Sequence, residues 1–235
     1  MSNVQTIQAP VKIGSGKMLR AMVGIGIACA LMIVLTYEGT LPLIEKNKAE
    51  ALEKAIFKVL PGTVTKQTFK LDENNVFTKI EGEEKEASLV YAGYDDEGKL
   101  VGLALEASGM GFADVLKILY GYNPEKQQVI GFYVLESKET PGLGDKIEKD
   151  PVFLSNFDGL DVALNDDLSA LKNTVASVKS GEKENAWEVD AITGATISSR
   201  AIGNIISEST SLWVPLLFQQ RDIFENAVTA EEKVQ

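Results

Sequence analysis

The longest apolar run of the chain lies near its N-terminus. No charged residue occurs over residues 21–37, and Met18 and Leu19 extend the run in front of Arg20. As a helix, residues 18–37 span about 30 Å at about 1.5 Å per residue, which is enough to cross the hydrocarbon core of a bilayer. The pattern therefore predicts a transmembrane helix at 18–37.

The charges on the two sides of this run differ. Lys12, Lys17 and Arg20 lie at its amino side, and residues 1–37 contain none of the 34 acidic residues. Basic residues stay preferentially on the cytoplasmic side of a membrane. We therefore expect a cytoplasmic tail at 1–17 and an acidic body outside the cytoplasm, as in a single-pass protein of the bacterial inner membrane.

A cleaved signal peptide and a lipoprotein signal are the alternatives to a permanent span. No small-x-small cleavage site follows the run cleanly, which disfavours a cleaved signal peptide. A lipoprotein signal would end at Cys29, but Gly26 stands where a leucine is usual and the apolar run continues past the cysteine. We interpret the run as an uncleaved single span.

Helical spacing continues behind the span. The apolar positions that follow it are Leu43, Ile44, Leu52, Ile56, Val59 and Leu60. Charged residues alternate with them and Pro61-Gly62 ends the segment, which predicts an amphipathic connecting helix at 38–62. Residues 63–86 are polar and poor in strand signals, so we expect an irregular connection there with a charged turn at 81–86.

The period then changes to that of β-strands. The predicted strands are 87–94, 100–107, 115–122 and 128–136. The turn sequences DDEGK and NPEKQ separate them into two antiparallel hairpins. Each hairpin has Gly-Tyr before its turn and a glycine in its return strand, Gly102 or Gly131. We interpret the hairpins as two repeat-like units, with chance resemblance as the alternative.

The rest of the body alternates short elements with polar loops. We expect a short helical stretch through Asn156, strands near 173–178 and 186–189, and a helix from Ser198 onward. The sequence therefore predicts an α+β fold: a transmembrane helix, then an extracytoplasmic domain at 63–218 with antiparallel hairpins and flanking helices. The remaining residues, 219–235, are expected to form a C-terminal tail.

Composition removes several kinds of chemistry. The chain has no histidine, and its one cysteine lies inside the apolar run. This excludes a Ser-His-Asp triad, histidine-ligated haem, the common zinc sites, an iron–sulfur ligand set and a disulfide framework. The net charge of −11 argues against a nucleic-acid partner. Redox work by this chain would therefore need an organic cofactor.

Two short segments carry candidate chemistry. The first is the loop ETPGLG, made of Glu139, Thr140, Pro141, Gly142, Leu143 and Gly144. Its proline fixes a turn and its glycines let the backbone approach a ligand closely, although an ordinary surface turn uses the same residue types.

The second segment is DAITGAT, residues 190–196. Thr196 stands just ahead of the predicted helix or at its first residue, where free amides and the helix dipole favour a phosphate. Gly194 and Ala195 leave room for a bulky ligand, and Arg200 lies about one turn further on, where it offsets phosphate charge. The alternative is that Thr196 only caps the helix.

Together these segments resemble the FMN-binding domain family. DAITGAT matches the flavinylation pattern Asp-x-x-Ser/Thr-Gly-Ala-Thr, and ETPGLG is similar to the second signature of that family. The resemblance implies FMN held covalently by a phosphoester bond to Thr196. It implies that Asp190, Thr193, Gly194 and Ala195 are read by the attaching enzyme, a magnesium-dependent flavin transferase with FAD as donor.

The resemblance also implies further contacts and partners. The loop Glu139 to Gly144 would line the flavin, and Phe112 in the stretch GMGF would stack on the ring. The chain looks most like the G subunits of Rnf ion-translocating electron-transport complexes, with the C subunit of sodium-translocating NADH:quinone reductase as the next relative. Electrons would then pass to and from neighbouring membrane, iron–sulfur and flavin subunits, with no catalytic residue in this chain.

A membrane-tethered binding or scaffold protein is the alternative from a different class. It would account for the anchor, the acidity and the absence of histidine. It leaves the conjunction of DAITGAT and ETPGLG unexplained.

Overall fold

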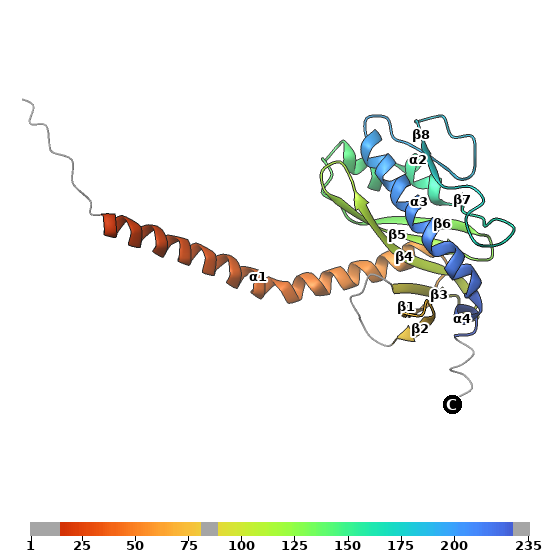
Figure 1. The fold of residues 1–235 in the computed structure, drawn as a ribbon, viewed down its shortest axis with the longest axis horizontal. Coiled ribbons are helices and arrows are strands. Elements are labelled where there is room, and N and C mark those ends of the chain that lie inside the picture. The colour runs from red at the N-terminus through yellow and green to blue at the C-terminus, as the bar shows by residue number, and fades with distance from the viewer. Residues whose placement is uncertain (1–14, 81–88, 228–235) are drawn as a thin grey trace, which may run out of the picture. The chain divides into compact units, whose positions relative to one another are not determined.

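The computed structural model describes residues 15–80 and 89–227, and it divides into two units at residue 50 (Figure 1). The first unit, as far as it is described, is the amino-terminal part of helix α1 (Ser15–Val59). This helix is long and apolar enough to cross a membrane. Its large apolar side chains are exposed on all sides over the predicted span, which suits a lipid environment.

Helix α1 continues without a break where the sequence predicts two helices. Residues 18–37 and the segment behind them belong to one helix of 45 residues that ends at Val59 and contains Pro42. The side chains change from apolar to charged, but Ala, Leu, Glu and Lys are all strong helix formers, so the helix continues past Pro42, which itself donates no backbone hydrogen bond. The helix ends before Pro61-Gly62, and Gly62 has φ +94°.

The second unit, residues 51–235, is built on one antiparallel sheet. Its strand order is β2-β1-β3-β4-β5-β6-β7. The strands are β1 (Thr65–Leu71), β2 (Phe77–Ile80), β3 (Leu89–Tyr94), β4 (Leu100–Met110), β5 (Val115–Asn123), β6 (Gln128–Glu136) and β7 (Leu160–Asp161). The α+β class and both predicted hairpins, β3–β4 and β5–β6, are confirmed.

The remaining elements lie on or beside this sheet. They are η1 (Gly144–Glu148), α2 (Pro151–Leu154), η2 (Ser155–Phe157), β8 (Ala176–Val178), β9 (Glu188–Asp190), α3 (Thr196–Gln219) and α4 (Arg221–Glu225). Strands β8 and β9 form a small parallel sheet. Helix α3 crosses one face of the main sheet and closes the larger core, while the last turns of α1 cover part of the other face (Figure 1).

The irregular connection expected at 63–86 is wrong for its described part. Strands β1 and β2 form a hairpin there, and β1 also pairs with β3. Only Phe69 of β1 and Phe77 of β2 are buried, so the segment shows no run of alternating apolar residues. Both aromatic rings pack on Phe224, at centroid distances of 4.9 and 5.0 Å. The charged turn expected at 81–86 lies outside the described residues.

The C-terminal tail expected at 219–235 is also wrong in its first part. Residues 221–225 form α4, whose Phe224 is fully buried in the main core. The Tyr94 hydroxyl donates a hydrogen bond of 2.8 Å to the Phe224 carbonyl. Phe224 is the only aromatic residue in this segment of the sequence, so no apolar pattern predicted a helix there. Its burial nevertheless fixes the segment to the domain.

Four glycines of the two hairpins lie on the sheet face that α1 covers. They are Gly93, Gly102, Gly121 and Gly131, here called the glycine strip. The first two are directly paired across β3–β4, and the last two are paired across β5–β6. A Cβ atom at Gly121 or Gly131 would overlap with the Val59 carbonyl oxygen. The four glycines thus leave room for Val59, Leu60 and Thr63 to approach the sheet closely.

We expect Gly131→Ala to destabilise the domain by roughly 1–3 kcal/mol, because the added methyl group must displace the backbone of Val59. Urea unfolding of the detergent-solubilised chain, followed by tryptophan fluorescence, measures this change. Gly159→Ala is the matched control, since its Cβ would lie 3.8 Å from the nearest heavy atom outside its chain neighbours. Equal midpoints for the two variants would contradict the role of the glycine strip.

Candidate functional site

Thr196 is the first residue of α3. The N-cap is Ala195, which offers no side-chain acceptor, and Gly194 before it has φ +84°, a conformation that favours glycine. The turn closes with a hydrogen bond of 3.1 Å from the Ala195 N–H to the Ile192 carbonyl. The expected position of Thr196 is confirmed, and the alternative in which its side chain caps the helix is wrong.

The first turn of α3 carries three hydroxyl groups with different surroundings. Ser199 is buried, and its Oγ accepts from the Ile192 N–H at 3.2 Å and donates to the Ala195 carbonyl at 2.9 Å. Ser198 is also buried and donates to Glu139. Thr196 is exposed, and its hydroxyl has no hydrogen-bond partner among the described residues. It is therefore the one free hydroxyl of this turn.

The start of α3 is suited to a phosphate. The Ser199 N–H makes the first intrahelical bond, to the Ala195 carbonyl at 2.9 Å, so the three amides before it point out of the helix end. These amides and the helix dipole favour an anion at this position. Arg200 is exposed one turn further on and makes no ion pair with a described residue, which leaves its guanidinium available for the same anion.

The Glu139 carboxylate connects three segments beneath this helix end. Its Oε1 accepts from the Phe112 N–H at 2.8 Å and from the Ala113 N–H at 3.0 Å. Its Oε2 accepts from the Ser198 hydroxyl at 2.6 Å. The residue is only 6% exposed. The turn after β4, the ETPGLG loop and the first turn of α3 are thus held together by one side chain.

The rest of the ETPGLG loop faces outward except for its last residue. Thr140, Pro141, Gly142 and Leu143 reach the surface, while Gly144 is buried. Gly142 has φ +79°, and its N–H donates to Asp145 at 2.6 Å. A hydrogen bond from Lys149, followed by the one from Gly142, lowers the pKa of Asp145 and keeps this loop anchor ionised.

Three large apolar side chains stand exposed around the helix end. They are Phe112, Leu143 and Ile197, at 63, 54 and 59% exposure, here called the apolar rim. Each comes from one of the three segments that Glu139 connects. Because Glu139 holds their three segments together, these side chains lie in the same region of the molecule. That Phe112 and the ETPGLG loop line a flavin stays a prediction.

Ile197 was not predicted as a site residue. The buried positions of α3 include Ser198, Ile202 and Ile205, so Ile197 falls outside the core-facing stripe. An isoleucine off that stripe and directly after Thr196 was the signal that could have identified it.

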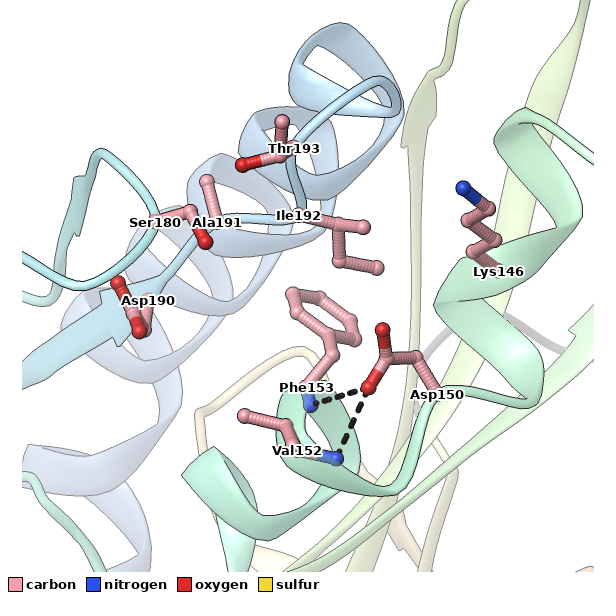
Figure 2. A pocket seen from close by; sticks show the side chains of 9 residues that line it. All are labelled: Lys146, Asp150, Val152, Phe153, Ser180, Asp190, Ala191, Ile192 and Thr193. Atoms are coloured by element: carbon pink, nitrogen blue, oxygen red, sulfur yellow. Dashed lines mark hydrogen bonds between the residues drawn. The ribbon is translucent and has the colours of Figure 1, made fainter.

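A cavity of about 310 Å³ lies beside the Thr193 turn (Figure 2). Its lining residues are Lys146, Asp150, Val152, Phe153, Ser180, Asp190, Ala191, Ile192 and Thr193. Figure 2 shows Ile192 and Phe153 pointing toward each other in its centre, with Lys146 and Asp190 at opposite sides. The cavity combines an apolar floor with charged walls of both signs, and Lys146 was another residue that the sequence pattern did not indicate.

Asp190 of the DAITGAT segment stabilises the walls of this cavity. Both of its carboxylate oxygens accept from the Gly181 N–H, at 2.7 and 3.0 Å. Its own N–H donates to Asn156 at 3.0 Å. On the opposite wall, Asp150 accepts from the Val152 and Phe153 N–H groups at 2.9 and 3.3 Å and caps α2 (Figure 2). The predicted site residues therefore fall into two neighbouring groups, one on the cavity and one around Glu139.

These residues fit the cofactor that the resemblance implied. A free hydroxyl at an uncapped helix end, with Arg200 nearby, is suited to a phosphate ester, and the apolar rim is suited to a flat ring. Residues 111–210, which contain all of these features, match the FMN-binding domain family. Fold and site thus define an FMN-binding domain behind a helix able to span a membrane.

The chain belongs to the family of G subunits of ion-translocating oxidoreductase complexes. It is 31% identical over 186 residues to the G subunit of the ion-translocating oxidoreductase complex of Methanosarcina acetivorans, with 79% of this chain and 87% of that protein covered. It is 29% identical over 189 residues to the G subunit of the Na(+)-translocating ferredoxin:NAD(+) oxidoreductase complex of Acetobacterium woodii, with coverages of 79% and 84%.

The fold is similar to that of solved proteins. NqrC of Shewanella oneidensis superposes with a TM-score of 0.56 at 21% identity, and the match covers 79% of this chain and 99% of that one. The C subunit of the Na(+)-translocating NADH-quinone reductase of Parabacteroides distasonis gives a TM-score of 0.56 at 24% identity, with coverages of 73% and 94%. At these identities the likeness shows the fold.

Proposed function

We propose that this chain carries FMN, attached through its phosphate to the hydroxyl of Thr196, and transfers electrons as a subunit of a membrane-bound ion-translocating complex. The observation that carries the proposal is the exposed, unpartnered hydroxyl at the first residue of an uncapped helix. When bound, the flavin supplies reversible one- and two-electron redox chemistry. The residues of this chain bind and position the flavin.

In the chemical step of attachment, Thr196 is the acceptor. Its oxygen would bond to the FMN phosphorus of FAD while AMP departs as the leaving group, and the hydroxyl proton would pass to a base of the transferase. The transferase, outside this chain, supplies the activating groups. The amides at the start of α3 and the Arg200 guanidinium then hold the negative charge of the phosphodiester.

The apolar rim gives the ring a place to pack. Phe112 offers an aromatic face, and Leu143 and Ile197 offer aliphatic contacts next to it. These side chains are exposed, so a ring that packs on them keeps an edge near the surface. We infer that this edge is where electrons enter and leave through neighbouring subunits that carry iron–sulfur centres or another flavin.

The relatives favour a G subunit over the C subunit of a quinone reductase. The 31% identical relative is named as a G subunit, whereas the superposed quinone-reductase proteins share only 21 and 24% identity. A non-redox scaffold is the competing class. Yellow colour that survives denaturation and precipitation of the purified chain distinguishes the flavoprotein from a scaffold, which would be colourless after the same treatment.

We further propose that α1 anchors the chain with its N-terminus in the cytoplasm. Lys17 and Arg20 lie at the amino end of the apolar part of α1, and Glu38 is the first acidic residue of the chain. A reporter that is active only outside the cytoplasm, fused after residue 235, should therefore be active. Activity of a strictly cytoplasmic reporter at the same position would show the opposite orientation.

A further inference from the structure

We propose that Glu139 is a positioning residue for flavin attachment. Its carboxylate presents Thr196 as the acceptor by holding the first turn of α3, and it does not contact the flavin. The inference rests on the proposed function and assigns this side chain a task within it.

The carboxylate is buried and satisfied by groups of the protein itself. Its two oxygens accept three hydrogen bonds, from Phe112, Ala113 and Ser198, and the residue is 6% exposed. A buried carboxylate is stable only with such partners, and loss of the carboxylate leaves each donor without an acceptor. Its contribution to the site therefore passes through the groups that donate to it.

Two glycines lie directly against the Glu139 carboxylate. Cβ atoms at Gly111 and Gly144 would both overlap with it. Glu139 lies 27 residues after Phe112 and 59 residues before Ser198 in the chain. The contact therefore joins segments that local structure does not bring together.

By binding Ser198, the Glu139 carboxylate also affects which hydroxyl of the turn is accessible to the transferase. Ser198 is two residues after Thr196, on the buried side of the same turn, and its hydroxyl proton points at Glu139. Ser199 is occupied by backbone partners. The helix turn is held with two hydroxyls inward and Thr196 outward, which leaves Thr196 as the accessible hydroxyl of the first turn of α3.

Two substitutions separate geometry from charge. Glu139→Gln keeps the shape: its amide oxygen accepts from Phe112 and Ala113, and its NH₂ donates to Ser198, whose hydroxyl reverses direction. Glu139→Ala removes all three acceptor contacts. The matched control is Glu148→Ala, which removes an exposed carboxylate from the neighbouring η1.

The first measurement is the FMN adduct on the full-length chain after co-expression with a flavin transferase, by intact-protein mass spectrometry. We expect at least a tenfold loss in Glu139→Ala, at least half of the parent level in Glu139→Gln, and no change in Glu148→Ala. A parent-like adduct in Glu139→Ala would overturn the proposal, and so would equal losses in the alanine and glutamine variants. If the alanine variant does not fold, Glu139→Asp replaces it, because its shorter side chain cannot reach all three donors.

The second measurement needs no flavin. Hydrogen exchange at the Phe112 and Ala113 amides is compared in a Thr196→Ala background, with and without Glu139→Ala. We expect at least a tenfold loss of protection at both amides without the carboxylate, and near-parent protection with glutamine. Unchanged protection would refute the positioning role even if the parent carries FMN. A parent with no adduct would refute the proposed function and, with it, a role in attachment, whereas a loaded parent with unchanged exchange would refute the role of Glu139 alone.

Discussion

Thr196→Ala removes the whole added mass of one FMN less water from the chain. The parent, purified after co-expression with a flavin transferase, is expected to carry this mass and to be yellow, and the alanine variant is expected to be colourless. Thr196→Ser keeps a hydroxyl at the same backbone position and should retain part of the adduct. Intact-protein mass spectrometry measures all three.

The same substitution should leave the fold unchanged. Thr196 is exposed and caps no helix, so its truncation should change the free energy of unfolding by less than about 0.5 kcal/mol. Ser211→Ala is the matched control, because it removes an exposed hydroxyl from the same helix without touching the site. An adduct that persists in Thr196→Ala, or a parent without one, would refute covalent attachment at this residue.

Gly194→Val should abolish flavin attachment in a protein that still folds. Gly194 has φ +84°, and a β-branched residue in that conformation costs about 1–3 kcal/mol, so the turn in front of Thr196 must shift. A Cβ atom at this position would have no heavy atom within 4 Å outside its chain neighbours, so the expected effect is conformational and not a steric clash. The adduct level by mass spectrometry and the far-ultraviolet circular dichroism spectrum test the two parts of this prediction.

Gly62→Val is the control for the backbone cost alone. Gly62 has φ +94° and equally open surroundings, but it lies behind α1, outside the site. We expect a similar loss of stability there with full attachment. Gly194→Asn should be intermediate, since asparagine tolerates the left-handed region better than valine. Full incorporation in Gly194→Val would show that this turn geometry is not required.

Elements with a strong period were predictable from the sequence. Strands β3 to β6 and helix α3 each carry apolar residues at the spacing of their secondary structure, and they were found at nearly the observed bounds. Strands β1 and β2 carry one buried phenylalanine each, so their position in the sheet depends on backbone pairing with β3 and on contact with Phe224. Neither interaction leaves a local pattern.

The place of the candidate site in the chain was predictable from the sequence, and its side-chain geometry was not. The position of Thr196 at a helix start followed from local sequence. The direction of the Glu139 side chain did not, because it depends on donors 27 residues before and 59 residues after it in the chain. The outward position of Ile197 depends on which stripe of α3 faces the sheet.

The glycine strip has a practical consequence for anyone who wishes to prepare this domain without its anchor. The end of α1 and the residue after it cover this face of the sheet: Ala55, Ile56, Val59 and Leu60 are all buried in one cluster, and Val59 and Leu60 lie against the strip. The sequence predicts that the domain starts at residue 63. A fragment that starts there would lack these four residues, and the glycine strip and the apolar side chains around it would be exposed to water. A water-soluble version should begin no later than Ala51, so that it keeps the end of α1, which covers this face of the sheet.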